Sequence, residues 1–450
     1  MPPFSNPSAA PETSNQSSSH RRFPPFLLSM VLVALAIRLV VVGFVYPYWL
    51  NPKRDYYEFG YEPGRVARSL ALGQGISNPL HGTTGPTALV MPVYPALLAG
   101  CFKLFGIYSK GAAIAILSLN SLFSALTCIP IFLIGLRSFD RRTAKIAACI
   151  WALFPNAIYF SANWMWASCL TTLFLAWLVL AVLYLQESSS KLAWIGFGLG
   201  CGVASLTEPS VMSVLPFLGA WACYRLHRRK QGWFAPASLA ALVFIAVVSP
   251  WFLRNYEVFH RFIPFRDGLG LELYVGNNGY TAHWAKGSIR PSNSPTELAE
   301  YAQSGELAYM AHKQQQALAF IKAHKAWFLG MTLRRTLYLW TGFWSFRQTY
   351  LEQEPLDPPN IVLNLVLLGL VVAGLRRAFR EQPEEVAPYL LLFLFFPLVY
   401  CVTHPEVYYM RPLDPFMILL AAYALAARGW ARVAENWAWA KKEGGQSAAL

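Results

Sequence analysis

The sequence predicts an all-α integral membrane protein: a multi-pass bundle of about ten transmembrane helices, or up to twelve, with amphipathic outer-loop helices and a small extracytoplasmic lobe. Three observations support this fold class. Hydrophobic residues make up 55% of the 450 residues and charged residues only 13%, which is more apolar surface than one soluble core can hold. The apolar residues form long runs, and basic residues cluster beside alternate ends of these runs.

Ten apolar runs approach the length of about 20 residues that is needed to cross the hydrocarbon core of a bilayer. The first run begins near residue 26 and is too long for a signal peptide, and no small-residue cleavage site follows it. We therefore expect it to be retained as a helix. The predicted spans cover residues 26–48, 111–136, 143–162, 165–186, 191–207, 210–226, 234–253, 360–375, 386–403 and 412–427.

Basic clusters predict the orientation of these spans. With ten helices, all the clusters fall on the same side of the membrane, which the positive-inside rule assigns to the cytoplasm. Both termini are then cytoplasmic, and the protein is expected in the cytoplasmic (inner) membrane. The clusters are Arg21 and Arg22; Arg137, Arg141 and Arg142; Arg225, Arg228, Arg229 and Lys230; Arg376, Arg377 and Arg380; and Arg428 and Arg432.

This topology divides the chain into five regions. Segments 91–106 and 319–346 are apolar and aromatic, and we expect them to lie on or dip into the outer interface. The regions are a disordered cytoplasmic tail (1–24), an N-terminal transmembrane region (25–253) that includes the first outer loop (49–90), an extracytoplasmic lobe with an interfacial helix (254–355), C-terminal transmembrane helices (356–428) and a second cytoplasmic tail (429–450).

Charge and cysteine usage exclude two other protein classes. The formal net charge is +14, but the basic residues flank apolar runs instead of forming one patch, so nucleic acid binding is not expected. The seven cysteines mostly occur singly within apolar stretches and include no CxxC pair. This pattern favours small buried side chains over a disulfide framework or a zinc site.

The first outer loop carries three carboxylates that could act as a general base: Asp55, Glu58 and Glu62. Pro63 is typical of the first position of a helix, which makes Glu62 the expected N-cap. A carboxylate held here could accept a proton from an acceptor hydroxyl. Alternatively, Glu62 only caps its helix and the other two are solvated loop charges.

Several motifs follow one another along the chain and all fall on the predicted outer side. These motifs are Ala67–Arg68–Ser69–Leu70 with Gly73 and Gly75; Pro92–Val93–Tyr94–Pro95 through Phe105–Gly106; Ser249–Pro250–Trp251 with Arg254 and Asn255; and Tyr408–Tyr409 with Arg411, Pro412 and Pro415. Their order resembles that of GT-C membrane glycosyltransferases, and in particular the family-39 group, which includes protein O-mannosyltransferases and the lipid A aminoarabinose transferase.

The resemblance implies a polyprenyl-phosphate sugar donor, inversion at the anomeric carbon and an acidic base, typically Asp, in the first outer loop. Counting back from Gly73 favours Glu58 as this base, whereas Glu62 lies one helical turn nearer in a more rigid position. The Asp-Glu pair that is usual in the family is absent, so Glu58, Glu62 and Asp55 stay open as alternatives.

A phosphate leaving group needs cations more than it needs an acid, because its developing negative charge must be stabilised. Arg254 and Arg411 could instead anchor helix ends at lipid headgroups. The residues expected to bind substrate are Tyr94, Arg254, Asn255, Arg266, Glu272, His404 and Arg411, with Arg290 as a further cation.

Other polar and aromatic residues have two possible roles each. Trp164, Trp166 and Trp284 could stack on sugars or belong to an interfacial aromatic belt. Glu208, in a tight outer turn, is a candidate for lining the site, whereas Glu306 is expected on a solvated helix face. Arg38 lies mid-helix and is expected to pair with a polar group inside the bundle.

The predicted function is sugar transfer from a polyprenyl phosphate to an acceptor hydroxyl on the outer membrane face. The acceptor could be a protein, a glycolipid or a polysaccharide. The alternatives are a polyprenyl-linked sugar transporter or flippase, and a catalytically inactive accessory membrane protein. No cofactor is certain: the sequence has no DxD motif or His cluster that demands a metal, and a divalent ion stays open.

Overall fold

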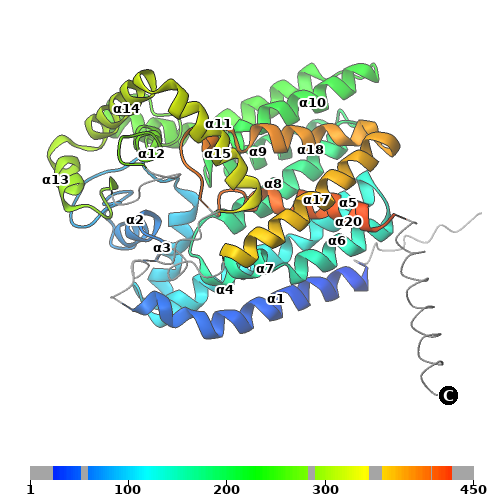
Figure 1. Cartoon of the computed structure of the whole chain (residues 1–450), viewed down its shortest axis with the longest axis horizontal. Coiled ribbons are helices and arrows are strands. Elements are labelled where there is room, and N and C mark those ends of the chain that lie inside the picture. The colour runs from blue at the N-terminus through cyan, green and yellow to red at the C-terminus, as the bar shows by residue number, and fades with distance from the viewer. Residues whose placement is uncertain (1–23, 52–58, 282–288, 344–356, 407, 428–450) are drawn as a thin grey trace, which may run out of the picture.

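A computed structural model of the chain describes residues 24–51, 59–281, 289–343, 357–406 and 408–427. Long helices pack side by side in these ranges, and shorter helices form a lobe at one end of the bundle, on the left of Figure 1. No β-strand forms within the described residues, and Ser77 and Pro86 make one isolated bridge. The predicted tails, 1–24 and 429–450, lie outside these ranges except for residue 24.

Each predicted span coincides with one helix or with two consecutive helices. The spans correspond to α1 (Pro25–Val45), α4 (Lys110–Leu126) with α5 (Cys128–Ser138), α6 (Arg141–Leu153) with α7 (Pro155–Asn163), α8 (Ser168–Leu185), α9 (Lys191–Ser205), α10 (Leu215–Arg228), α11 (Phe234–Phe259), α17 (Asp357–Glu381), α18 (Pro383–Phe395) with α19 (Leu398–Val402), and α20 (Asp414–Leu425).

Fewer of these helices are able to cross a membrane when judged by length and composition alone. In the part of the chain that the structure describes, six candidate spans are long and apolar enough, and a seventh is added if the bent α6–α7 pair counts as one span. Shorter apolar helices, such as α9, are not among these candidate spans. The total of ten to twelve spans therefore stays a prediction.

Charged turns meet at the end of the bundle opposite the lobe. Arg137 and Arg229 contact Glu187 at 2.5 and 2.8 Å, and Arg225 contacts Glu384 at 2.5 Å. These residues follow the second, fourth and sixth predicted spans or precede the ninth. These turns therefore share one end of the bundle.

Arg38 is fully buried in α1 and bonds to the break between α6 and α7. Pro155 has no backbone N–H, so the preceding turn has carbonyls without helical partners. Arg38 donates to the carbonyl oxygens of Trp151 and Ala152 at 3.3 and 3.0 Å, and to Ser124 Oγ at 3.0 Å. The polar partner expected inside the bundle is therefore mainly the backbone of a broken helix.

The lobe combines the first outer loop with the segment after α11. Its buried core includes Leu89, Leu271, Val275 and Tyr309. A Cβ on Gly270 would collide with a backbone carbonyl of α14, so glycine permits close approach of α12 and α14. The helices are α2 (Glu62–Ala71), α3 (Val93–Phe105), α12 (Leu269–Gly276), α13 (Pro295–Ser304), α14 (Glu306–Ala323) and α15 (Lys325–Thr341).

Candidate active site

A cavity of about 570 Å³ lies where the lobe meets the bundle. This volume is within the range of small-molecule sites. Its walls come from the first outer loop, α3, the turns before α8 and after α9, α12, and the segment between α19 and α20. Six of the predicted base and substrate-binding residues line it: Glu62, Tyr94, Arg266, Glu272, Arg290 and His404.

Two candidate bases, Asp55 and Glu58, lie outside the described residues. Glu62 is the first residue of α2, and Tyr61 is its N-cap, so the predicted cap position was wrong by one residue. A backbone φ of 54° at Tyr61 turns the chain sharply into this helix. Glu62 is consequently held at the start of α2, on the cavity wall.

Arg254 and Asn255 do not line the cavity. Arg254 donates to the carbonyl oxygens of Thr87 and Ile76 at 2.8 and 2.7 Å. Asn255 is fully buried and donates to the carbonyl oxygen of Ile263 at 3.1 Å. Arg254 therefore joins the end of α11 to the first outer loop, whereas Asn255 joins it to the segment that follows α11.

Arg411 also lies away from the cavity lining. Its Nη1 is 3.1 Å from Asp414 Oδ2, and its guanidinium stacks over the Phe160 ring at 5.5 Å. This side chain therefore links the start of α20 to α7.

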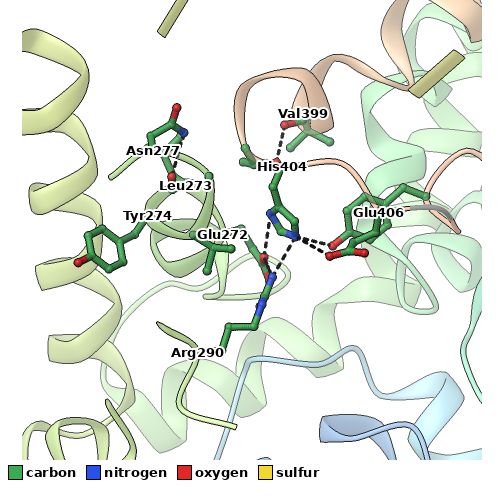
Figure 2. Close-up of polar contacts among 12 residues, drawn as sticks. Glu272, Leu273, Tyr274, Asn277, Arg290, Val399, His404 and Glu406 are labelled. Atoms are coloured by element: carbon green, nitrogen blue, oxygen red, sulfur yellow. Dashed lines mark hydrogen bonds and ion pairs between the residues drawn. The ribbon is translucent and has the colours of Figure 1, made fainter. Parts of the chain in front are cut away.

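A cluster of ionic residues forms one wall of the cavity (Figure 2). Arg290 Nη2 is 2.6 Å from Glu272 Oε2, and Nη1 is 3.3 Å from Oε1. Arg266 Nη2 lies 3.7 Å from Glu272 Oε1, and His404 Nδ1 lies 3.4 Å from Oε2. Residues from α12, its flanking loops and the α19–α20 segment thus meet at one carboxylate.

The charge states in this cluster follow from burial and pairing. Burial alone would raise the pKa of Glu272, but the Arg290 guanidinium lowers it to about 2. Burial lowers the pKa of His404 to about 4, so this ring is neutral at pH 7. Two guanidiniums, Arg266 and Arg290, then face the ionised Glu272 carboxylate beside the cavity.

Hydrogen bonds select the tautomer of His404. Its Nε2 lies 2.9 Å from Arg290 Nη2 and 3.2 Å from Tyr409 Oη. The guanidinium can only donate, so Nε2 accepts and the ring proton is on Nδ1, on the side of Glu272. The neutral His404 ring therefore accepts a hydrogen bond from Arg290 and helps to hold this guanidinium beside Glu272.

The Glu208 carboxyl group also lines the cavity. Burial raises the pKa of Glu208, which favours its protonated form. Burial would lower the pKa of Arg266, but Glu208, Glu272 and Glu62 together raise it. These carboxylates therefore lie close enough to Arg266 to act on its charge.

An aromatic wall also lines the cavity. The Tyr408 ring centroid lies 5.4 Å from that of Trp164 and 5.5 Å from that of Trp166. Trp284 lies outside the described residues. Tyr94, on α3, is buried, and its hydroxyl accepts from Asn120 Nδ2 at 3.0 Å. Flat rings beside charged groups suit a ligand that has both an apolar face and an anionic part.

The expectation that Glu306 lies on a solvated helix face was wrong. Glu306 is 6% exposed and accepts bonds from Thr87 Oγ1 at 2.5 Å, the Ala88 backbone N–H at 2.6 Å and Tyr301 Oη at 2.7 Å. Helical periodicity alone does not indicate that the distant first outer loop covers this position.

In the loop between the last two spans, His404 and the Tyr408–Tyr409 motif were predicted, but the contacts of Tyr409 and Glu406 with His404 were not. Tyr409 bonds to His404, and Glu406 Oε1 lies 3.9 Å from His404 Nε2. The density of polar and aromatic residues in this short predicted outer loop could have identified them. Among the residues that the structure describes, no group of three or more His, Cys, Asp and Glu side chains could hold a metal ion.

Comparisons with known proteins were made for both sequence and fold. No curated protein sequence matches the chain. The family model described as dolichyl-phosphate-mannose-protein mannosyltransferase matches residues 86–253. This match begins in the first outer loop and ends in α11, so it includes the Pro92–Gly106 motif.

Solved structures resemble the described chain across most of its length. The Archaeoglobus fulgidus oligosaccharyltransferase complex with Zn and sulfate has a TM-score of 0.50 at 14% identity, covering 89% of this chain and 48% of that one. AglB from the same organism, in complex with an inhibitory peptide and a dolichol-phosphate, has a TM-score of 0.50 at 14% identity, covering 89% and 50%. ArnT from Cupriavidus metallidurans, bound to undecaprenyl phosphate, has a TM-score of 0.38 at 16% identity, covering 90% and 78%.

The chain spans about half the length of the archaeal oligosaccharyltransferase structures that it matches. At such low identity, the likeness establishes the fold. Together with the apolar helices, it identifies an integral membrane protein. The resemblance predicted from the motifs is therefore confirmed: residues 86–253 match the protein mannosyltransferase family model, and the described chain shares its fold with the archaeal oligosaccharyltransferase structures.

Proposed function

We propose that this protein transfers a sugar from a polyprenyl-phosphate donor to an acceptor hydroxyl at the outer face of the cytoplasmic membrane. One observation carries the proposal: the 570 Å³ cavity joins a carboxylate of the first outer loop, two guanidiniums and an aromatic wall. The family-model match supports the same reaction class. Dolichol-phosphate, present in the AglB structure, is a lipid of the proposed donor class.

The phosphate of the donor would face Arg266 and Arg290. During transfer, the bond between the anomeric carbon and the phosphate oxygen breaks, and its electron pair leaves with the phosphate. Cations oriented before the reaction stabilise this developing charge. Glu272 holds Arg290 in place through two contacts, at 2.6 and 3.3 Å, so little reorganisation is needed.

The acceptor hydroxyl forms the new bond to the anomeric carbon and loses its proton to a carboxylate. We assign this role to Glu62, because it is a predicted base that lines the cavity. Glu58 and Asp55 are its alternatives. A single displacement by an activated acceptor inverts the anomeric centre, as in inverting glycoside hydrolysis.

The sugar ring would pack against Trp164, Trp166 and Tyr408, whose rings lie together on the cavity wall. This arrangement leaves the anomeric carbon between the phosphate-binding cations and the base. Protein, glycolipid and polysaccharide acceptors all offer the hydroxyl that the reaction needs.

The proposed orientation puts both termini in the cytoplasm and the cavity on the extracytoplasmic side. Its support is the separation of charge along the bundle. Arg137, Arg225 and Arg229 belong to turns at the end opposite the cavity, and the positive-inside rule assigns such turns to the cytoplasm.

The test uses purified full-length protein in lipid nanodiscs with radiolabelled polyprenyl-phosphate sugars and a panel of acceptors. We expect Glu62→Gln to lower the rate of sugar transfer by about 10² or more, because a general base typically contributes 10²–10⁴. Glu58→Gln and Asp55→Asn are the matched comparisons. Loss of transfer in Glu58→Gln with a normal rate in Glu62→Gln would move the base to Glu58.

The same preparation separates the proposal from its two alternatives. Movement of the sugar head group across proteoliposomes without transfer would support a flippase. A wild-type protein with neither activity, tested with the full acceptor panel, would support an accessory role.

A further inference from the structure

Arg335 lies behind the ionic wall of the cavity, on α15, and is fully buried. Its Nη2 donates to the carbonyl oxygen of Gly276. Its Nη1 donates to the carbonyl oxygen of Val402 at 3.2 Å and to Asn277 Oδ1 at 3.1 Å. One guanidinium therefore joins three groups on two separate segments.

Both carbonyl groups belong to helix ends. Gly276 is the last residue of α12, and Val402 is the last residue of α19. Carbonyls at helix ends have no partner within the helix and carry partial negative charge, so a cation is favourable there. Glu272 lies one turn before Gly276, and His404 lies two residues after Val402.

The two segments also contact each other directly. Asn277 Nδ2 donates to the carbonyl oxygens of Leu273 and Val402, both at 2.9 Å. A Cβ on Gly276 would collide with the carbonyl group of Thr403, so the two backbones touch here. Figure 2 shows Leu273 and Glu272 of α12, and Asn277 directly after this helix, beside the loop that carries His404.

Nothing in these contacts neutralises the charge of Arg335. Among the described residues, its bonded partners are two backbone carbonyls and one amide. Burial lowers the pKa of Arg335 to about 10, which still leaves it charged at neutral pH. Burying a cation without a carboxylate is costly, whereas a neutral amide would avoid this cost but could not bond to all three acceptors.

We propose that Arg335 is a positioning residue of the active site: it fixes α12 against the α19–α20 segment, so that the Glu272–Arg290 pair and His404 keep the spacing needed to bind the donor phosphate. Arg335 does not line the cavity and acts only through these residues. The inference rests on the proposed transferase function for its effect on rate. The contact by which Arg335 fixes α12 against the α19–α20 segment, called the clamp below, can be tested without measuring activity.

The kinetic test compares Arg335→Gln and Arg335→Lys with Arg334→Gln, a change at the neighbouring exposed position of the same helix. We expect kcat per folded protein to fall about tenfold to hundredfold in Arg335→Gln, because a displacement near 1 Å can cost about 10² in rate. Arg335→Lys should recover part of this loss, since its ammonium can bond to some of the same acceptors. Arg334→Gln should match the wild type.

A second pair of variants tests the same contact without removing a charge. Gly276→Ala should reduce kcat as Arg335→Gln does, because the added methyl group separates the two backbones. Gly279→Ala is its control, because a Cβ there meets nothing within 4 Å. A purely structural role would lower the yield of folded protein and its melting temperature, but leave the kcat of the folded fraction unchanged.

Hydrogen exchange of backbone amides supplies the readout that needs no substrate. Peptides covering 269–278 and 399–406 should exchange faster in Arg335→Gln and Gly276→Ala than in Arg334→Gln and Gly279→Ala. Wild-type exchange in both regions of the folded Arg335→Gln protein would overturn the proposal. Faster exchange in a protein whose wild type transfers no sugar would support the clamp and reject the transferase function.

Discussion

Two buried carboxylates in the lobe, Glu272 and Glu306, have opposite surroundings. Glu272 faces the cavity and bonds to the Arg290 guanidinium, which lowers its pKa to about 2 against the effect of burial. Glu306 is covered by the first outer loop and accepts from two hydroxyls and a backbone N–H. Burial raises the pKa of Glu306, because these neutral donors do not fully offset desolvation.

The difference separates residues that arrange charge from residues that hold the scaffold together. A carboxylate paired with a cation stays ionised and orients that cation toward the cavity. A carboxylate satisfied by neutral donors cross-links the segments that carry those donors. Burial of an acidic side chain therefore does not identify a functional site unless its partners are also known.

The largest effect should come from removing the cation of the cavity cluster. Arg290→Gln should lower transfer by about 10²–10³, the usual cost of losing one group that stabilises transition-state charge. Arg254→Gln, beside Glu306, should mainly lower the melting temperature and change kcat of the folded protein by less than about tenfold, since most surface and scaffold changes leave chemistry intact. Equal losses of kcat in the two variants would remove the distinction between the regions.

Glu306→Ala should have the next largest effect, on stability. It leaves Thr87, Tyr301 and the Ala88 N–H without their acceptor, and each buried unsatisfied group costs about 1–3 kcal/mol. Glu306→Gln retains one acceptor oxygen and should lose less. Denaturant unfolding in detergent measures both, with Glu257→Ala as a control at an exposed site. Equal stability of Glu306→Ala and Glu257→Ala would contradict the cross-linking role.

Smaller effects of pH should have opposite signs in the two regions. Burial, and then Glu306, raises the pKa of Asp267 to about 7, against about 3.9 in an unfolded chain. The folded state then binds more protons, so this group makes stability fall as pH rises from about 4 to 7. Glu272 does the reverse: its contribution is present above about 4.3, the unfolded value, and is lost as pH falls toward 2.

Melting temperatures recorded from pH 4 to 8 test this sign. Asp267→Asn should flatten the decline in stability toward neutral pH. Glu272→Gln should keep that decline, because its own titration lies at lower pH. A steeper decline in Asp267→Asn would show that the sign is wrong.

The smallest effect is expected at the opposite end of the bundle. Glu384 contacts Arg225 at 2.5 Å, but its side chain is 69% exposed. Exposed ion pairs contribute little, because water and salt screen them. Glu384→Gln should leave both the melting temperature and kcat unchanged, and a clear loss of either would show that the charged turns do more than mark orientation.

Helix positions were predictable from the sequence because they depend on local composition. Each predicted span coincides with one or two helices, and the outer segment 91–106 contains α3 (Val93–Phe105). Breaks within spans were not predicted. The α6–α7 break lies directly before Pro155, and its stabilisation depends on Arg38 from another helix.

Site residues were predictable only in part. Residue type and predicted side of the membrane selected Glu62, Arg266, Glu272 and His404, and these four side chains line the cavity. The same reasoning could not distinguish them from Arg254. In the sequence, a cation at a helix end looks the same whether its side chain faces a cavity or a backbone carbonyl.

By itself, the sequence determined a multi-pass membrane protein, the approximate place of each helix, the alternation of its turns and the resemblance to GT-C transferases. Hydropathy and charge asymmetry are local properties, and the bilayer acts on each segment separately. Only the tertiary structure decided which charges meet: Glu272 with Arg290 at the cavity, Glu306 with Thr87 away from it. Those pairings arise from packing between distant segments, and sequence spacing carries no information about the side chain that will lie opposite another.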